Sequence, residues 1–257
     1  PSNEVENWLR IQGDRFQNMV IRGFHTELEA VYEEFNISLT NDTRKEFAAI
    51  GKMLFPTHPY GTQTTIGTQD HLKNPSITNI KNYFKHYYVP NNVAICMAGD
   101  FDPDKVIATI DRYFGSWKKS DNVVYPQFPV QKDLTSPVST TVMGKEAENI
   151  MMAWKMSGAA ELQNDTLSVI SQILSNGKAG LFDIDINQPM RCQGAQAFNY
   201  DMRDYSQFIV FGMPNEGQSL DDVKNIILAE IEKLKNGEFS DKLLPAIINN
   251  MKLDHLH

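Results

Sequence analysis

An acidic run in the first part of the chain holds residue types that bind cations. The stretch TELEAVYEEFN, residues 26–36, contains four glutamates in eleven residues: Glu27, Glu29, Glu33 and Glu34. Thr26 followed three residues later by Glu29 is a capping-box pattern, which predicts a helix that begins at Thr26 or one turn earlier. Carboxylates on such a helix either face water or, when they turn toward the protein, need a cation beside them.

The helical period divides these glutamates into two pairs. At about 100° per residue, one side of the helix collects an apolar stripe of Phe24, Leu28, Val31 and Phe35. Glu29 and Glu33 then lie opposite the stripe, in water. Glu27 and Glu34 lie together at its border, half turned inward. They are ~10 Å apart along the helix axis, so they cannot easily share one coordination shell.

Two interpretations of the inward pair stay open on this geometry. In one, a single glutamate is a metal ligand and the other supports it. In the other, both form ordinary ion pairs with nearby cations such as Arg15 or Arg22. The residues alone favour the second interpretation, because paired carboxylates are common and a lone carboxylate does not make a metal site.

The sequence contains no other familiar catalytic pattern. It has no GxSxG for a serine nucleophile, and GTQTTIGT at residues 61–68 lacks the spacing and the lysine of a phosphate-binding loop. The six histidines form neither HExxH nor HxxEH, and no Cys/His cluster occurs. His58, in HPYG beside two prolines, is predicted to have a structural role in a loop.

Composition excludes several classes of function. The 257 residues carry a net charge of −8 with a pI near 5.3, which argues against a nucleic-acid partner. No apolar run approaches the roughly 20 residues that span a bilayer. The two cysteines, Cys96 and Cys192, lie in apolar strand-like stretches and are predicted to be buried free thiols. The sequence does not determine the compartment; an extracytoplasmic location such as the periplasm is compatible with a bacterial source and an upstream leader.

Helical and strand patterns alternate along the chain. Helices are predicted at 3–23, from 26, and at 41–54, 74–87, 102–114, 160–174, 179–186, 220–234 and from 240. Strands are predicted at 93–99, 139–143, 149–156, 194–200 and 207–213. Residues 55–68 are predicted to be a loop. Residues 94–115 and 208–234 share one order of strand, turn, acidic cap and amphipathic helix, which is compatible with a duplicated domain.

A proline-rich segment separates the two halves of this pattern. Residues 116–138, SWKKSDNVVYPQFPVQKDLTSPV, contain three prolines and no helical period. Such a composition is typical of a linker between domains. We therefore place a domain boundary here, with one domain at residues 1–118 and the other at residues 119–257.

Several stretches together resemble the insulinase/pitrilysin-type zinc metallopeptidases, or inverzincins. They are ELEAVYEEFN, then HPYGTQTTIGTQDHLKNPSITNIKNYFKHYYVPNNVAICMAGDFDPDKVIATIDRYFGSW, then ILSNGKAGLFDIDINQ. The likeness is ordered and nearly continuous from about Arg15 to Trp117, and looser beyond. It implies an α/β (α+β sandwich) fold with mostly antiparallel sheets covered by helices, in duplicated domains that are both truncated here.

The resemblance also implies a site. In that family an HxxEH helix supplies two histidine ligands and a glutamate base, and a glutamate on a later helix completes the zinc coordination. Matched residue by residue, EAVYEE places the zinc ligand at Glu34 and a supporting carboxylate at Glu27. Residues 1–118 are then the later part of a catalytic-type domain, and residues 119–257 the first part of a non-catalytic companion.

This chain departs from the family pattern at two points. It has no HxxEH, so this piece is expected to be inactive alone and not to retain zinc. Family members often hold substrate with an arginine and a tyrosine after the LF of the second domain. Here Asp185 or Ile186 stands near the arginine position, residues 192–194 stand near the tyrosine position, and Arg191 is displaced.

Two functions follow as expectations. The first is a part of a zinc metalloendopeptidase that hydrolyses peptides, with a peptide substrate in the intact protein. The second is a non-catalytic homologue that acts as a peptide-binding or assembly partner. In both cases the incomplete domains are expected to pack against missing halves of their own chain or to self-associate, because truncated sheets leave exposed edges.

Overall fold

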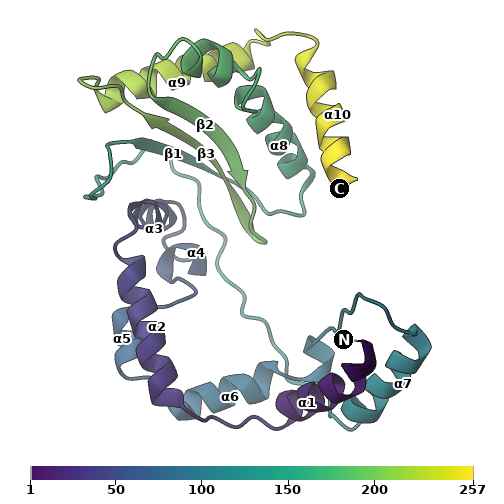
Figure 1. The fold of residues 1–257 in the computed structure, drawn as a ribbon. Coiled ribbons are helices and arrows are strands. Elements are labelled where there is room, and N and C mark those ends of the chain that lie inside the picture. Colours follow the sequence, from purple (N-terminus) through teal and green to yellow (C-terminus); the bar gives the residue numbers. More distant parts are fainter. Residues whose placement is uncertain (1, 257) are drawn as a thin grey trace. The chain divides into compact units, whose positions relative to one another are not determined.

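The computed structural model describes residues 2–256 and shows an α+β protein that is mostly helical, with one three-stranded antiparallel sheet in this range. The described residues form two compact units. The helical unit consists of residues 2–39 and 63–129, and the sheet unit of residues 40–62 and 130–256. Figure 1 follows the chain from one unit into the other. The domain boundary at 118/119 stays a prediction.

The helical unit is built from short and medium helices. They are η1 (Ser2–Glu4), α1 (Val5–Gln17), α2 (Phe24–Ser38), α5 (Gln69–Lys73), α6 (Ile77–Tyr87), η2 (Pro90–Asn92) and α7 (Pro103–Phe114). Helices α1 and α7 pack closely, because Gly13 has no side chain: a Cβ there would lie 2.9 Å from the carbonyl oxygen of Tyr113. The Asp102 side chain caps α7 by accepting from the backbone N–H groups of Asp104 and Lys105.

Local signals predicted α1, α2, α6 and α7, but not α5, and several boundaries differ. Helix α1 ends at Gln17, although the sequence predicted it to continue to Gly23. Helix α2 begins at Phe24 after Gly23, whose φ is +61°, so the Thr26 capping box does not form. Helix α6 begins at Ile77 with Ser76 as its cap, and Pro75 precedes it. The predicted loop at 55–68 contains the short helix α4 (Pro59–Thr62), and α5 follows it.

The strand predicted at residues 93–99 does not form, and this prediction is wrong for the described chain. These residues are irregular, and Cys96 is exposed where we predicted a buried thiol. A strand is stable only when a neighbouring strand takes its backbone hydrogen bonds. The ladders among the described residues join only the three strands of the sheet unit, so residues 93–99 have no partner there.

The sheet unit is organised around three strands in the order β1-β3-β2. They are β1 (Ile150–Ser157), β2 (Gly194–Tyr200) and β3 (Tyr205–Met213), all antiparallel and all predicted from the sequence. The strand predicted at 139–143 does not form, because no ladder reaches it. The helical elements are α3 (Asp42–Leu54), α4, α8 (Leu162–Leu174), η3 (Asp183–Asn187), α9 (Leu220–Lys235) and α10 (Leu243–His255).

Each face of the sheet is covered by helices (Figure 1). Alternate residues of a strand point to opposite faces, so Phe208 and Val210 of β3 face α8 and α9, where the main apolar core lies. On the other face, Tyr205 packs beside a smaller core made by Leu54 and Phe55 of the α3–α4 region. This second layer comes from residues that precede the sheet by about a hundred positions.

Asp42 fixes the start of α3 to the sheet unit. Its carboxylate accepts hydrogen bonds from the Lys145 amide at 2.5 Å and the Glu146 amide at 2.9 Å, and Lys45 Nζ lies 2.9 Å away. Gly144 is required beside it, since an added Cβ would overlap the carboxylate. These donors, the Lys45 side chain first, lower the pKa of Asp42 to about 2.

We expect Asp42→Asn to lower the melting temperature at pH 7 by several degrees. Because the folded pKa is depressed from 3.8, the stabilisation by Asp42 is present above pH 4 and is lost as the pH falls toward 2. The difference between wild type and variant should therefore shrink across that window in thermal melts from pH 7 to pH 2. The exposed Asp241→Asn is the control. A difference that is constant with pH would contradict the assignment.

Candidate functional site

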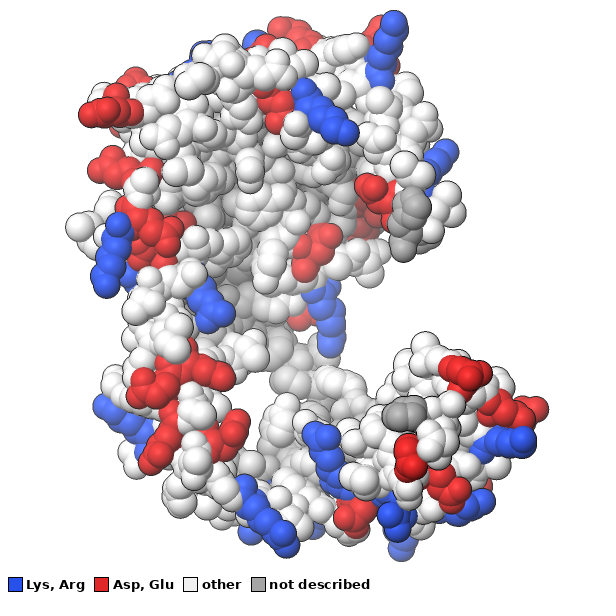
Figure 2. Space-filling model, in the orientation of Figure 1, with Lys and Arg blue, Asp and Glu red and all other residues white. Residues whose placement is uncertain are grey.

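The two glutamates singled out by the sequence lie on the surface of the helical unit. In the structure all four glutamates of α2 are exposed, and α2 has no buried residue. Figure 2 shows acidic side chains gathered where Figure 1 places α2. The inward turn expected for Glu27 and Glu34 is therefore wrong for the described chain. The apolar stripe of α2 is only half-buried, so its border is open to water.

The helix that carries Glu34 is held by α5. Tyr32 of α2 accepts a hydrogen bond from Gln69 Nε2 of α5 at 2.8 Å, and the two helices pack together. Within residues 2–256, no three His, Cys, Asp or Glu side chains come together in a way that could hold a metal ion. The residues present therefore do not make a zinc site by themselves, and Glu34 stays a predicted ligand.

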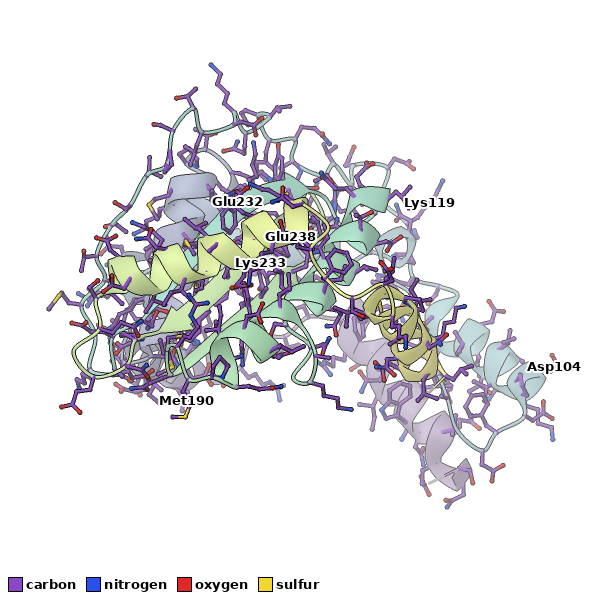
Figure 3. The ribbon with its side chains drawn as sticks, turned by 90° about the horizontal axis from the view of Figure 1, so that it is seen from above. Asp104, Lys119, Met190, Glu232, Lys233 and Glu238 are labelled. Atoms are coloured by element: carbon purple, nitrogen blue, oxygen red, sulfur yellow. The ribbon has the colours of Figure 1, made fainter. Side chains whose placement is uncertain are left out.

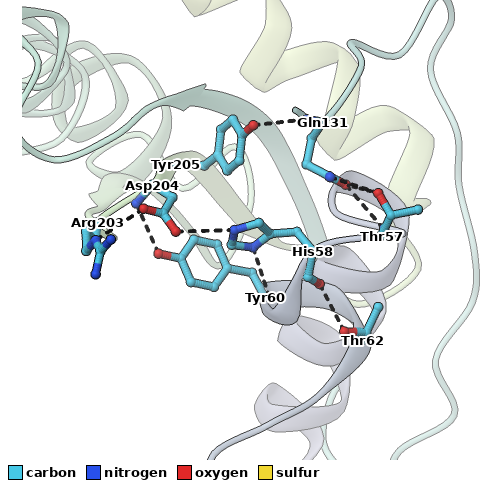
Figure 4. Close-up of polar contacts among 8 residues, drawn as sticks. All are labelled: Thr57, His58, Tyr60, Thr62, Gln131, Arg203, Asp204 and Tyr205. Atoms are coloured by element: carbon cyan, nitrogen blue, oxygen red, sulfur yellow. Dashed lines mark hydrogen bonds and ion pairs between the residues drawn. The ribbon is translucent and has the colours of Figure 1, made fainter. Parts of the chain in front are cut away.

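A buried histidine lies in the sheet unit, at the end of the α3–α4 region (Figure 4). His58 is only 2% exposed, and its Nε2 lies 3.3 Å from Oδ2 of Asp204. The backbone N–H of Tyr60 donates to His58 Nδ1 at 3.3 Å. Since Nδ1 accepts this bond, the imidazole carries its proton on Nε2 and donates it to Asp204.

Aromatic and amide groups enclose this pair. The His58 ring lies 4.3 Å from the Tyr60 ring and 5.4 Å from the Tyr205 ring, both edge-on. The Tyr60 hydroxyl accepts from the Asp204 backbone N–H at 3.1 Å, and the Tyr205 hydroxyl accepts from the Gln131 N–H at 2.9 Å. Gln131 in turn donates to the hydroxyl of Thr57 at 2.8 Å.

This arrangement fixes structure and offers no reacting group. A histidine–aspartate pair assists catalysis when the imidazole can take a proton from a nucleophile. Here Nδ1 already accepts from Tyr60, and Nε2 already donates to Asp204. The loop role predicted for His58 agrees with this geometry. No local pattern pointed to Asp204, because His58 and Asp204 lie far apart along the chain.

A second charged cluster includes Asp185, which the family resemblance places near the position of the substrate-holding arginine. Lys233 Nζ of α9 lies 2.9 Å from Asp185 Oδ2 and 2.9 Å from Glu230 Oε2. Arg191 reaches Glu230 at 3.4 Å. Figure 3 shows Lys233 on α9 above the sheet, with Met190 in the loop that leads to Arg191. Two carboxylates and two cations thus balance each other inside the sheet unit.

Burial separates the two acids of this cluster. Glu230 is 1% exposed, and desolvation raises its pKa. The hydrogen bond from Lys233 lowers the pKa of Asp185, and the paired carboxylates raise the pKa of Lys233. Arg191, the displaced arginine of the sequence, is therefore engaged by Glu230 and joins α9 to the loop that precedes β2.

Comparison with known proteins decides the family. Residues 76–251 match the family described as the peptidase M16 inactive domain, which is more than half of the chain. The chain belongs to the M16 family. This confirms the insulinase/pitrilysin-type resemblance read from the sequence.

Relatives of this M16 chain include zinc proteases. The zinc protease PqqE of Helicobacter pylori is 26% identical over 204 residues, which is 77% of this chain and 46% of that protein. A crystal structure of a protease from Helicobacter pylori has a TM-score of 0.82 at 22% identity, covering 99% of this chain and 63% of that one. The M16 chain thus spans less than half of the length of PqqE.

A third similar structure is that of a protease solved in complex with another protein. The ferredoxin protease FusC, solved as a mutant with Arabidopsis ferredoxin, has a TM-score of 0.69 at 14% identity, covering 96% of this chain and 28% of that one. At these identities the structures show a common fold. Among residues 2–256 of the M16 chain, no helix is long and apolar enough to cross a membrane.

We expect His58→Ala to destabilise the sheet unit by about 2–3 kcal/mol, since it opens a cavity and leaves Asp204 and the Tyr60 N–H without their partner. The measurement is urea unfolding, with exposed His25→Ala as the control. Nitrogen NMR of the wild type should show His58 with its proton on Nε2. A proton on Nδ1 at neutral pH, or equal stability of the two variants, would contradict the geometry.

We expect Glu230→Gln to stay within about 1 kcal/mol of wild type at pH 7, because the amide keeps the shape and an acceptor oxygen for Lys233 and Arg191. Glu230→Ala should lose about 3 kcal/mol, because it opens a cavity at a buried position and removes that acceptor. The pKa of Glu230 is raised in the folded state above its unfolded value near 4.5. The stabilisation of the folded state by Glu230 is therefore fully present below pH 4.5, and it is lost as the pH rises through the folded pKa. In Glu230→Gln, the free energy of unfolding should depend less on pH above pH 4.5 than it does in the wild type. Equal losses for both variants at pH 7 would disprove this account.

Proposed function

We propose that this M16 chain is part of a longer zinc-dependent metalloendopeptidase that hydrolyses peptides. The observation that carries the proposal is family membership over residues 76–251, together with a relative that is itself a zinc protease. Peptide substrate and zinc belong to the longer protein. The described residues hold no complete metal-binding group, so this chain alone should neither retain zinc nor cleave peptides.

Glu34 is the proposed zinc ligand, and Glu27 is the proposed supporting carboxylate. Both stand on the same side of α2, seven residues apart, in the motif that resembles the family's later ligand helix. Their exposure supports the proposal, because a ligand that completes a site with residues of another segment has to be accessible to it. The other ligands would come from a part of the longer protein that holds HxxEH.

We further propose that residues 1–118 are the later part of the catalytic-type domain and residues 119–257 the first part of its companion. The α3–α4 region supports a close relation between them. It lies before residue 118 in the sequence, yet it packs in the sheet unit. The charged cluster around Glu230 supports a companion without a free arginine for substrate, because Arg191 is already paired.

A non-catalytic partner is the second candidate, and one observation favours it. The family match is to a domain described as inactive, and it begins at residue 76, after both glutamates. A homologue of this kind would keep the fold and bind or assemble with other chains without cleaving them. The FusC structure, with ferredoxin bound, is compatible with protein binding by this fold.

Zinc analysis of the longer protein separates the two candidates. We expect about one zinc per chain in the wild type, and loss of most of it in Glu34→Gln, because the amide is a poor zinc ligand. Glu29→Gln is the matched control on the same helix and should keep its zinc. A zinc-free wild type after metal-replete purification would support the non-catalytic partner. Equal zinc content in the wild type, Glu34→Gln and Glu29→Gln would contradict the assignment of Glu34 as a zinc ligand.

A further inference from the structure

A cavity of about 460 Å³ lies in the sheet unit, at the end of the sheet where β1 and β2 begin and β3 ends. Three segments line it: Ala147 and Glu148 before β1, Gln193 before β2, and residues 214–219 between β3 and α9. The register brings these segments together, because β3 pairs with both other strands at this end. A cavity of this volume is large enough for a small ligand or a single side chain of a partner.

Side-chain amides hold the wall between β3 and α9 in place. Asn215 Nδ2 donates to the carbonyl oxygen of Met190, and Gln218 Nε2 donates to that of Arg191, both at 2.9 Å. Gln218 Oε1 accepts from the Asn215 N–H at 2.9 Å. Three polar lining side chains have no such bond within residues 2–256, and they are left to bind a ligand: Glu148, Gln193 and Glu216.

The unpaired charge of the cavity is negative. Glu148 and Glu216 are exposed, and neither forms an ion pair with a cation of residues 2–256. By contrast, Glu230 of the same unit is paired with Lys233. The two carboxylates at the cavity therefore have no cation of the described chain to balance them, and the ligand that complements them is a cation.

The adjoining end of α9 does not favour an anion in the cavity. A helix amino end attracts negative charge, but Asp221 and Asp222 already stand in the first turn of α9. Ser219 is also engaged, because it forms the capping box of this helix with Asp222. The helix dipole is thus complemented within the chain, and the two glutamates decide the charge of the ligand.

The remaining lining groups fit an arginine side chain. A guanidinium has only donors, spread over a planar fork, and it matches two carboxylates together with the amide oxygen of Gln193. Ala147 and Pro214 supply apolar surface on which the methylene stem of an arginine can lie. A lysine ammonium is a point charge and engages separate acceptors less well. The lining therefore favours arginine over lysine.

An exposed methionine lies next to the cavity wall. Met190 is the one residue other than glycine with a positive φ, +55°, in the range 2–256, and its side chain is 73% exposed. Asn215 of the wall donates to its carbonyl oxygen, and Figure 3 shows Met190 pointing away from the ribbon. Left-handed backbone is uncommon for residues with a side chain, so this bond supports the conformation that presents Met190 to solvent. Methionine packs against apolar partners of varied shape.

We propose that this cavity binds an arginine side chain of a partner polypeptide, with Glu148 and Glu216 holding the guanidinium. An apolar residue next to that arginine packs on Met190. The partner is thus a peptide segment in which arginine follows an apolar residue. This inference does not depend on the proposed peptidase function, because binding is measured without cleavage.

Titration of the full chain with two short peptides tests the proposal. One peptide, acetylated and amidated at its ends, has arginine after leucine in an alanine background. The other has citrulline in place of arginine, which keeps the shape and removes the charge. Amide chemical shifts in NMR should change at Gln193 and residues 215–218. At low salt we expect the arginine peptide to bind about tenfold more tightly than the citrulline peptide, and added salt to reduce the difference.

Two double variants separate the cavity from the overall negative charge of the chain. Glu148→Gln/Glu216→Gln should bind the arginine and citrulline peptides alike. Glu161→Gln/Glu238→Gln makes the same change of net charge at exposed positions outside the lining, and it should bind as the wild type does. Equal affinity of the wild type for the two peptides, or an equal loss in the two double variants, would overturn the proposal.

Two further comparisons test the kind of partner. Met190→Ser should weaken binding of the leucine–arginine peptide several-fold, and a peptide with serine in place of leucine should not distinguish this variant from the wild type. An unchanged affinity for the leucine–arginine peptide in Met190→Ser would contradict the contact with Met190. A lysine peptide that binds as tightly as the arginine peptide would contradict the assignment of arginine.

Discussion

The architecture depends on one constraint, which is that the three-stranded sheet is apolar on both faces. The central strand β3 is buried along most of its length, because alternate residues meet helices on opposite sides. Helices α8 and α9 cover one face, and Gly212 allows Val223 and Ile227 to approach the strand closely. The other face needs a second cover. The chain supplies it from residues 42–62, and the polar contacts at both ends of that segment fix its position.

Three carboxylates of the sheet unit hold segments of the chain together. Asp42, Asp204 and Glu230 each join elements that are distant in sequence, and each lies in the sheet unit. The acidic helix α2 is different, because its carboxylates face water. A carboxylate paired with donors of its own chain contributes to stability, whereas an exposed one is free to bind a partner. The sheet unit therefore resembles a rigid companion, and α2 resembles a contributor to a site completed elsewhere.

The comparisons place this chain in the M16 family and beside longer zinc proteases. The family match covers most of the second half and stops short of the glutamates. The matched part of this chain spans 46% of a relative that is a zinc protease. We propose that the chain supports a peptidase site of a longer protein, with Glu34 as its contribution to the zinc coordination.

The sequence by itself determined the features that arise within a few residues. Asn41, Asp102 and Ser219 cap their helices, because each side chain accepts from a backbone amide two or three positions ahead. The three strands of the sheet were also predicted, and the family resemblance was confirmed. Tertiary structure alone decided the rest. Residues 93–99 have a strand pattern and no strand, because pairing needs a distant partner. The period of α2 gave the direction of Glu27 and Glu34 but not their exposure, which depends on what packs against the helix. His58 contacts Asp204 only because residues 42–62 pack against the sheet, and no local sequence pattern predicts that packing.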